Sequence, residues 1–286
     1  MNSQLSERIR QKSGDFSKGQ RAIARYIEEH SDKVAFMTAS KLGATVGVSE
    51  STVVRFATEI GYSGYPALQQ AMQEMIRSKM TSVQRLEMTS SNVPPEKLLD
   101  QDIDILKRTK ETVDREAFYR AADALMNARK VYVLGAGSSL ALATFLAHYL
   151  RLIFDTVHLI EATSEYTILQ QMVRAGEEDA IIAISFPRYS KKAAKTLKYA
   201  SDRGMATIAI TDSRLSPLAE HASHLLLARS DMVSFVDSLV GPLSVINALI
   251  VTVAIRKKAE VAHTLQQIET IWDEYNVYEK VDEKNS

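Results

Sequence analysis

Lys130–Leu150, KVYVLGAGSSLALATFLAHYL, is the stretch of the 286-residue chain that decides its fold. A short apolar run, Val131–Leu134, leads directly into Gly135-Ala136-Gly137-Ser138-Ser139. An alanine- and leucine-rich helical pattern follows without a gap. A buried strand, a glycine turn and a helix start in direct succession are typical of the first half of a βαβ unit.

The glycine turn also suggests a chemistry. The first turn of a helix has unpaired backbone N–H groups and the positive end of the helix dipole, so it favours an anion. Glycine lets the backbone approach that anion, and the hydroxyls of Ser138 and Ser139 add donors. The alternative is a tight turn whose serines only cap the helix. The five residues by themselves leave both interpretations open.

The same alternation of strand and helix continues along the chain. Further strands are expected at four places: 157–160, 180–185, 206–211 and 225–228. Helices are expected from Ser164, over 190–202 and over 237–257. This pattern predicts a parallel, doubly wound α/β sheet covered on both faces. Such sheets bind ligands at the carboxyl ends of their strands, where Gly137–Ser139, Ser185–Ser190 and Thr211–Ser213 fall.

The N-terminal region has an all-helical pattern. A helix over 17–30, capped by Ser17, precedes a short helix over 39–46 capped by Thr38. Gly47-Val48-Ser49 is a three-residue turn before a helix over 50–60. Two short helices joined by a tight glycine turn match a helix-turn-helix unit. We expect Val53, Val54 and Ile60 to pack inward.

In a helix-turn-helix unit, the start of the second helix meets base edges in the major groove of DNA. Ser49, Ser51, Thr52 and Arg55 stand at these positions, and arginine and hydroxyl side chains suit guanine and phosphate contacts. The alternative is a plain helical hairpin with Arg55 as a solvated charge. Residues 1–80 carry 11 Lys/Arg against 8 Asp/Glu, which permits binding of double-stranded DNA without showing it.

The composition of the chain excludes several classes of protein. The chain has no cysteine, which excludes disulfides and thiolate metal sites and suits a reducing cytoplasm. Met1–Lys12 is polar, so no targeting signal is expected. The most apolar stretch, 240–255, is too short and too interrupted to span a membrane. Thr264–Tyr278 has an apolar helical stripe suited to core or subunit packing.

These motifs resemble two known modules. GAGSS, AIIAIS-x4-S and ATIAITDS-x3-PLA together resemble a sugar isomerase (SIS) domain, and VSESTVVRFATEIGYSGY resembles the helix-turn-helix of RpiR-family bacterial transcriptional regulators. The resemblance covers roughly residues 1–80 and 110–260. It implies a flavodoxin-like sheet and a regulator whose SIS domain binds a phosphosugar or related anionic metabolite as effector. It places Ser138, Ser139, Ser185 and Ser190 around the phosphate, with Gly137 beneath it.

The resemblance also suggests how the chain is divided. We expect a DNA-binding domain over 1–80, a linker and connecting helix over 81–112, and a SIS domain over 113–260. A C-terminal helix and tail would occupy 261–286. A single helix-turn-helix makes few base contacts, so we expect the chain to pair with itself as a homodimer or homotetramer. No cofactor, metal or membrane partner is expected.

One loop departs from the family pattern. The loop after the third strand reads Ser185-Phe186-Pro187-Arg188-Tyr189-Ser190, with Arg188 where a glycine is common in the family. Arg188 could add a cation to the anion site, or it could point to solvent beside Lys191, Lys192 and Lys195. Both interpretations stay open.

Two other functions are considered from the residues. A sugar-phosphate isomerase would need a positioned base, for which the candidates are His148, Glu161 and Glu165. His148 is expected to be a structural histidine, and the two carboxylates could serve as caps. Dinucleotide binding would require a G-x-G-x-x-G fingerprint, whose third glycine is replaced by Leu140. A regulator accounts for more of the chain than either enzyme.

Overall fold

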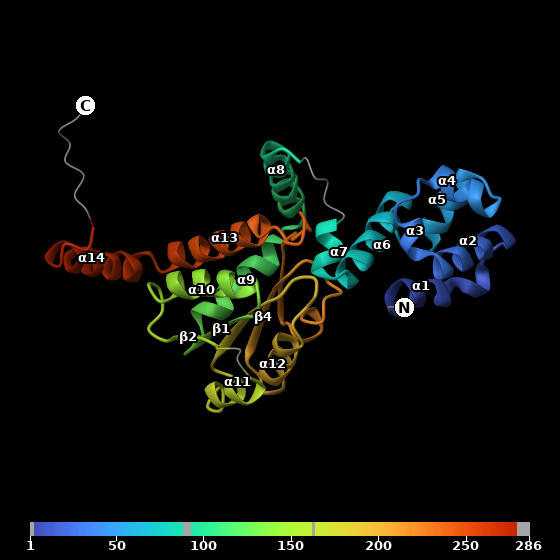
Figure 1. Cartoon of the computed structure of the whole chain (residues 1–286). Helices are drawn as coiled ribbons and strands as arrows, with labels where there is room; N and C mark the ends of the chain where they lie inside the picture. Colours follow the sequence, from blue (N-terminus) through green and yellow to red (C-terminus); the bar gives the residue numbers. More distant parts are fainter. Residues whose placement is uncertain (1–2, 88–92, 162–163, 279–286) are drawn as a thin grey trace. The chain divides into compact units, whose positions relative to one another are not determined.

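The computed structural model describes residues 3–87, 93–161 and 164–278 and divides the chain into two compact units, Met1–Thr89 and Ser90–Ser286. Each unit has its own hydrophobic core. The first unit is helical and the second contains a sheet covered by helices (Figure 1). The helices and strands in Figure 1 carry the labels used below.

The first unit consists of short helices in the predicted order. They are α1 Ser3–Lys12, the 3-10 turn η1 Ser13–Asp15, α2 Lys18–Glu29, α3 Ser31–Val34, α4 Ala39–Val46, α5 Glu50–Glu59, α6 Tyr65–Lys79 and α7 Ser82–Glu87. The three predicted caps are confirmed. The side chains of Ser17, Thr38 and Ser49 each accept a hydrogen bond from the backbone N–H three residues on. Gly47 ends α4 with φ of 74°, the left-handed conformation expected for the turn.

The core of the first unit corrects one prediction. Val53 and Ile60 are buried as expected, but the side chain of Val54 is exposed. The buried positions on α5 are Val53, Phe56, Ala57 and Ile60, which follow the i, i+3, i+4, i+7 spacing of one helical face. Val54 lies one residue, or about 100°, away from Val53 around the helix and therefore faces outward.

The segment 81–112, expected to form a linker and connecting helix, begins with a short helix that the sequence did not single out. Ser82–Glu87 forms α7. Thr81 and Gln84 form a reciprocal pair, in which the backbone N–H of each donates to the side chain of the other at 2.9 and 3.2 Å. Such a capping box starts a helix even in a serine- and threonine-rich segment. Residues 88–92 of the expected linker lie outside the described residues.

The second unit contains a five-stranded parallel sheet with strand order β2-β1-β3-β4-β5. The strands are β1 Val131–Gly135, β2 Val157–Leu159, β3 Ala180–Ile184, β4 Ala206–Thr211 and β5 His224–Leu227. The helices are α8 Pro95–Thr112, α9 Arg115–Met126, α10 Ser139–Leu150, α11 Glu165–Gln171, α12 Lys191–Asp202, the 3-10 turn η2 Ala219–His221, α13 Val240–Arg256 and α14 Lys258–Glu274. The predicted doubly wound sheet is confirmed, because this is the flavodoxin-like strand order.

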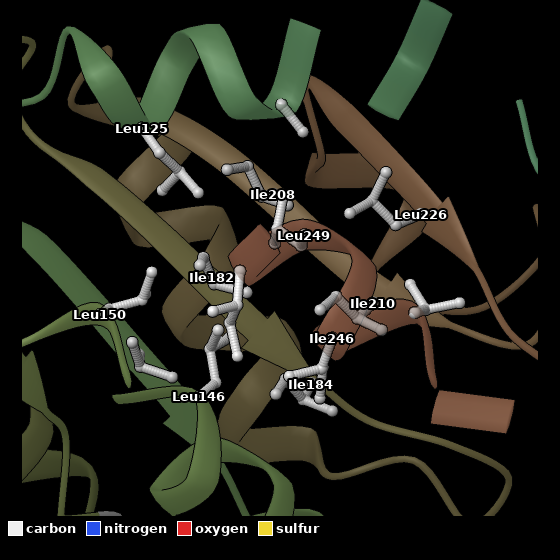
Figure 2. Packing of buried hydrophobic residues seen from close by; sticks show 14 of the residues in the cluster. Leu125, Leu146, Leu150, Ile182, Ile184, Ile208, Ile210, Leu226, Ile246 and Leu249 are labelled. Carbon is white, nitrogen blue, oxygen red and sulfur yellow. The ribbon is translucent and has the colours of Figure 1, made fainter. Parts of the chain in front are cut away.

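Helices cover both faces of the sheet because its residues alternate between two cores. Val133, Ile182 and Ile208 pack on the side covered by α9, α10 and α13 (Figures 1 and 2). Leu134, Ile181 and their neighbours form the second core with α11 and α12. β1 and β3 are buried throughout, which explains why their sequences are continuous apolar runs and not alternating patterns.

The C-terminal part of the unit differs from the expectation in one respect. α13 begins at Val240, so the residues after β5 form a loop over 229–239. α14 follows α13 after a single residue, Lys257, with a bend of 101° between the helices. None of the α14 residues is fully buried, but Val261 packs against the core covered by α9, α10 and α13, and subunit packing of the rest of the stripe remains a prediction.

In the described parts of the chain, no single helix is long and apolar enough to cross a bilayer. Among the described helices, α13 and α14 reach that length and composition only when they are taken together, and this pair is bent by 101°.

Candidate functional site

The predicted effector residues lie at the carboxyl ends of two neighbouring strands. β1 and β3 pair in parallel, and Gly135 is the register partner of Ile184. The loop before α10 and the loop before α12 therefore leave the sheet side by side, at its carboxyl edge. This places Gly137–Ser139 next to Ser185–Ser190, as ligand sites on open parallel sheets require.

The loop after β1 brings α10 very close to the strand. A Cβ atom on Gly135 would lie 2.3 Å from the backbone oxygen of Ser139, so only glycine fits there. Gly137 has φ of 61°, a left-handed conformation that glycine adopts without strain. Ser138 is exposed and occupies the N-cap position of α10, yet no side chain caps this helix. The N–H groups of Leu140 and Ala141 donate to the carbonyls of Gly137 and Ser138 at 3.1 and 3.3 Å, so an anion at this helix start would meet the N–H groups of the residues before them.

Two of the remaining predicted residues already have structural roles. Ser185 is buried, and its hydroxyl accepts a hydrogen bond from the backbone N–H of Ser190 at 3.0 Å. The Ser190 hydroxyl accepts from the N–H of Ala193 at 3.2 Å and caps α12. These two serines are held in fixed positions by the loop and α12. Ser139 is also buried.

Arg188 has an unusual backbone and a defined partner. Its φ is 70°, the left-handed region that residues with a side chain rarely adopt. Its guanidinium lies 3.9 Å from the carboxylate of Asp237, a residue of the 229–239 loop. The Arg188 side chain is 42% exposed and that of Asp237 only 10%. The Arg188 guanidinium therefore lies beside the 229–239 loop and is partly exposed to solvent.

Sequence reasoning missed three residues at this edge. Tyr189 donates a hydrogen bond from its hydroxyl to Asp212 at 2.8 Å, and Asp212 follows β4 directly. Asp212 was within the predicted strand-end segment Thr211–Ser213, so its position could have been inferred. The ion pair of Asp237 with Arg188 could not be inferred from the sequence, because 48 intervening residues separate the two.

The residues proposed for isomerase chemistry are scattered. Glu165 at the start of α11 accepts a hydrogen bond from Lys195 at 2.8 Å, and this partner lowers its pKa. A carboxylate held in its charged form by a lysine is a weak base. Glu161 is exposed. His148 is exposed on α10 and packs edge-on against Tyr149.

The second candidate site lies on α5. Ser49, Ser51 and Arg55 are exposed on one side of the start of the helix, and Thr52 is half-buried. The Ser49 hydroxyl is within 2.9 Å of that of Ser51 and 2.8 Å of that of Thr52, so three hydroxyls form one cluster. The Arg55 Nε–H donates to the Ser51 carbonyl at 3.4 Å. The structure therefore brings all four predicted residues together.

The start of α2 adjoins this cluster, which the sequence did not suggest. A Cβ atom on Gly19 would lie 3.1 Å from Val48 and 3.6 Å from the methyl group of Thr52. Lys18, next to Gly19, is exposed. The first turn of α2 therefore lies beside the first turn of α5.

Comparison with known proteins identifies the family to which the two units belong. The family model "Helix-turn-helix domain, rpiR family" matches residues 3–79, and the SIS domain model matches residues 124–252. The sugar isomerase domain of an RpiR transcription factor from Sphaerobacter thermophilus is 33% identical, with a TM-score of 0.58 over 62% of this chain and 98% of that one. The chain belongs to the RpiR family of transcriptional regulators. The resemblance seen in the sequence is therefore confirmed.

Two further proteins match over almost the full length. The transcriptional regulator HexR of Pseudomonas aeruginosa is 25% identical over 92% of this chain and 94% of its own. The Vibrio vulnificus NanR protein, solved in complex with ManNAc-6P, has a TM-score of 0.57 and 22% identity over 93% of this chain and 98% of its own. This second likeness concerns the fold.

Proposed function

We propose that this RpiR-family protein is a bacterial transcriptional regulator that binds operator DNA through α5. At the carboxyl edge of its sheet it binds a phosphosugar or a related anionic metabolite as effector. The observation that carries the proposal is the presence of both surfaces on one chain. One is an exposed hydroxyl and arginine face on a helix-turn-helix. The other is an uncapped helix start beside two fixed serines.

The α5 surface gives the first test. Arg55 lies where an arginine can bond a guanine through two N–H groups. We expect Arg55→Ala to weaken binding to an operator selected from random DNA by roughly 1–3 kcal/mol and to relax the preference at one base pair. Thr58→Ala, on the exposed side of the same helix but one turn later, is the matched control and should bind as the unaltered chain does. Equal affinity and base preference in Arg55→Ala would rule out this role of Arg55.

The effector is proposed to be a phosphorylated sugar or a related anion. Support comes from the chemistry of the edge, since the backbone N–H groups of α10, the Ser138 hydroxyl and the Arg188 guanidinium are all hydrogen-bond donors. NanR, a relative with the same fold, binds ManNAc-6P. A thermal-shift screen of phosphorylated sugars against their unphosphorylated forms tests this class. Stabilisation by both forms alike would argue against a phosphate site.

Self-association is proposed from the exposed stripe on α14. Val261, Leu265, Ile268, Trp272 and Tyr275 follow alternating steps of four and three residues, the spacing of a helix that packs against another helix. Leu265 and Tyr275 are exposed, and no residue of α14 is buried. The single residue between α13 and α14 is too short for α14 to fold back along α13 as a helical hairpin.

A second copy of the chain is the partner we propose for this stripe. Ile268→Asp should shift the protein towards monomer in sedimentation experiments at micromolar concentration, because a charge at the centre of the stripe would be buried in the dimer. Gln267→Asp, one residue away on the exposed side, is the control. A dimer that is equally stable in both variants would exclude α14 from the interface.

The regulator is proposed to have no isomerase activity and to act in the bacterial cytoplasm, where operator DNA is found. The pairing of Glu165 with Lys195 supports the first part, because it lowers the pKa of one of the candidate bases. Incubation with phosphosugars that bind in the thermal-shift screen, followed by analysis of the products, tests for turnover. Conversion of an aldose phosphate to a ketose phosphate would contradict this assignment.

A further inference from the structure

The loop over residues 229–239, which we call the β5–α13 loop, contacts α8. It also contacts the carboxyl edge of the sheet, where the proposed effector residues lie and which we call the effector edge. Its internal hydrogen bonds hold it in one shape. Met232 and Asp237 form an antiparallel bridge, and the N–H of Ser238 donates to the Asp231 carbonyl at 2.9 Å. The Ser230 hydroxyl donates to the Ser238 carbonyl at 3.0 Å. A segment bonded to itself in this way can move as a unit.

One end of the β5–α13 loop lies at the effector edge. The Asp237 carboxylate, with only 10% of its side chain exposed, lies 3.9 Å from the Arg188 guanidinium. The negative charge of a carboxylate that is mostly removed from water must be stabilised by nearby cations and hydrogen-bond donors. An anion that binds Arg188 therefore competes with Asp237 for the same positive charge.

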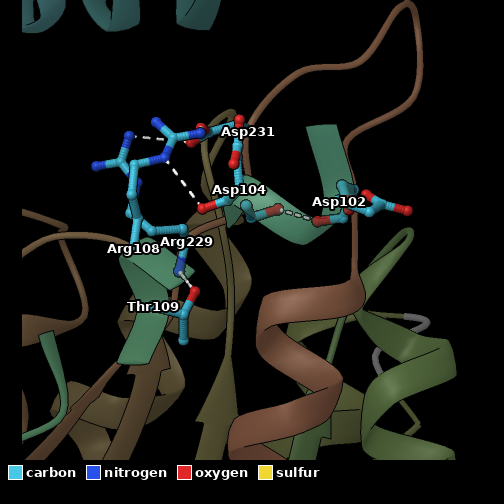
Figure 3. A network of polar contacts seen from close by, with 8 residues as sticks. Asp102, Asp104, Arg108, Thr109, Arg229 and Asp231 are labelled. Carbon is cyan, nitrogen blue, oxygen red and sulfur yellow. Dashed lines mark hydrogen bonds and ion pairs between the residues drawn. The ribbon is translucent and has the colours of Figure 1, made fainter. Parts of the chain in front are cut away.

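The other side of the loop is bonded to α8 at three points (Figure 3). Arg108 pairs with Asp231 at 2.6 Å, and the backbone N–H of Arg229 donates to the Thr109 hydroxyl at 3.1 Å. The Ser238 hydroxyl donates to the Asp102 carboxylate at 2.5 Å. Thr109 is buried, so its bond to the loop is protected from water.

The packing at the end of the β5–α13 loop leaves little room for the loop to move independently of α8. A Cβ atom on Gly241 would lie 2.4 Å from the Arg229 carbonyl and 2.7 Å from the Thr109 hydroxyl. The loop, the start of α13 and α8 are therefore in direct contact. A displacement of the loop has to be accommodated by α8.

We infer that the β5–α13 loop couples the occupancy of Arg188 to the position of α8, and so regulates DNA binding. α8 is the first described helix after residues 88–92, which join the second unit to the DNA-binding unit along the chain. In the free protein, Arg188 holds Asp237. An anionic effector takes Arg188, Asp237 loses this partner, and the loop changes its hold on α8. The inference rests on the proposed effector site.

Coupling of this kind requires an element with two arrangements that both sites influence. The loop has the required features, because its contacts to Arg188 and to α8 are made by adjacent residues. Asp237 contacts the effector edge and Ser238 contacts α8. The path from the guanidinium of Arg188 to the carboxylate of Asp102 therefore passes through two neighbouring residues.

The first experiment needs no effector. Arg188→Ala and Asp237→Asn each break the ion pair, and amide hydrogen exchange in the full chain reports on α8. We expect exchange over residues 102–109 to become at least about threefold faster in both variants, and no faster in the double variant than in either single one. Asp123→Asn, which breaks the contact of α9 with Arg256 at another place in the same unit, is the control. Unchanged exchange in α8 would overturn the inference.

The second experiment measures operator affinity, with DNA selected from a random pool. Arg188→Ala should change the operator Kd at least about threefold, and Ser238→Ala combined with Thr109→Val and Arg108→Ala should abolish that change. An Arg188→Ala effect that persists after all three loop contacts to α8 are removed would overturn the coupling path. Failure of the unaltered chain to select any DNA would instead refute the proposed function, and the exchange experiment would still decide the inference.

Discussion

Arg188 offers a test in which two substitutions should differ in stability but weaken effector binding alike. Its φ of 70° costs a residue with a Cβ atom about 1–2 kcal/mol relative to the right-handed region. Its ion pair with Asp237 is partly exposed, and such pairs contribute about 0–1 kcal/mol. Replacing Arg188 by alanine keeps the backbone strain and loses the pair. Replacing it by glycine loses the same pair but relieves the strain.

The magnitudes follow from these contributions. Glycine gives the unfolded chain more conformational freedom, which destabilises the folded state by about 0.5–1 kcal/mol. This cost offsets part of the free energy gained by relieving the backbone strain. Arg188→Gly should therefore be about 0.5–1 kcal/mol more stable than Arg188→Ala and close to the unaltered chain. Both variants lose a charge-assisted hydrogen bond to the effector, worth about 1.5–3 kcal/mol, or at least about tenfold in Kd.

Urea unfolding measures the stabilities, and calorimetric titration with the phosphosugar found by thermal shift measures the affinities. Ser185→Ala provides the comparison, and Arg188→Ala should weaken effector binding by at least as much. Wild-type effector affinity in both Arg188 variants, with weaker binding in Ser185→Ala, would refute contact between Arg188 and the effector. A glycine variant less stable than the alanine variant would refute the strain argument.

Three further predictions concern stability, each measured by urea unfolding. Tyr65 is buried, its hydroxyl donates to the Met37 carbonyl at 2.8 Å, and burial raises its pKa to about 12; Tyr65→Phe should cost about 1–2 kcal/mol, and no loss would show that water satisfies that carbonyl. Gly135→Ala should cost about 3 kcal/mol or more, because its Cβ would lie 2.3 Å from the Ser139 oxygen, whereas Gly176→Ala, with open space around it, should stay within about 0.5 kcal/mol. Burial lowers the pKa of His224, so its contribution to stability is complete above the unfolded pKa of about 6.5 and is lost as pH falls through the lower folded value; His224→Gln should flatten this loss, and identical pH profiles would contradict it.

Much of the fold could be predicted because its determinants are local. Ser17, Thr38 and Ser49 cap helices through bonds to residues three positions away, and such bonds are visible in a sequence. The strands also follow directly from apolar runs bounded by turn residues. Val54 was placed inward wrongly, because it adjoins the buried Val53 in sequence but faces outward on the helix. α7 was missed, because its start depends on the reciprocal capping pair of Thr81 and Gln84.

The candidate sites were predictable only in part. Ser138 and Ser185 could be placed at one sheet edge because parallel strands share their carboxyl ends. The partner of Arg188 and the contacts of α8 with the β5–α13 loop join residues far apart in sequence. The pair of Ser238 with Asp102 spans 136 positions, for example. No periodicity or turn signal records such a pair, so its discovery requires the folded structure.

The shortness of β2 has a consequence for solubility. β2 lies at one edge of the sheet and has only three residues, all paired to β1 on its inner side. An outer edge with long rows of unpaired N–H and C=O groups would serve as a template for strands from other molecules. Three residues provide few such groups, so edge-to-edge growth of the sheet into aggregates has little to start from. Concentrated protein should therefore resist conversion to cross-β aggregates at this edge.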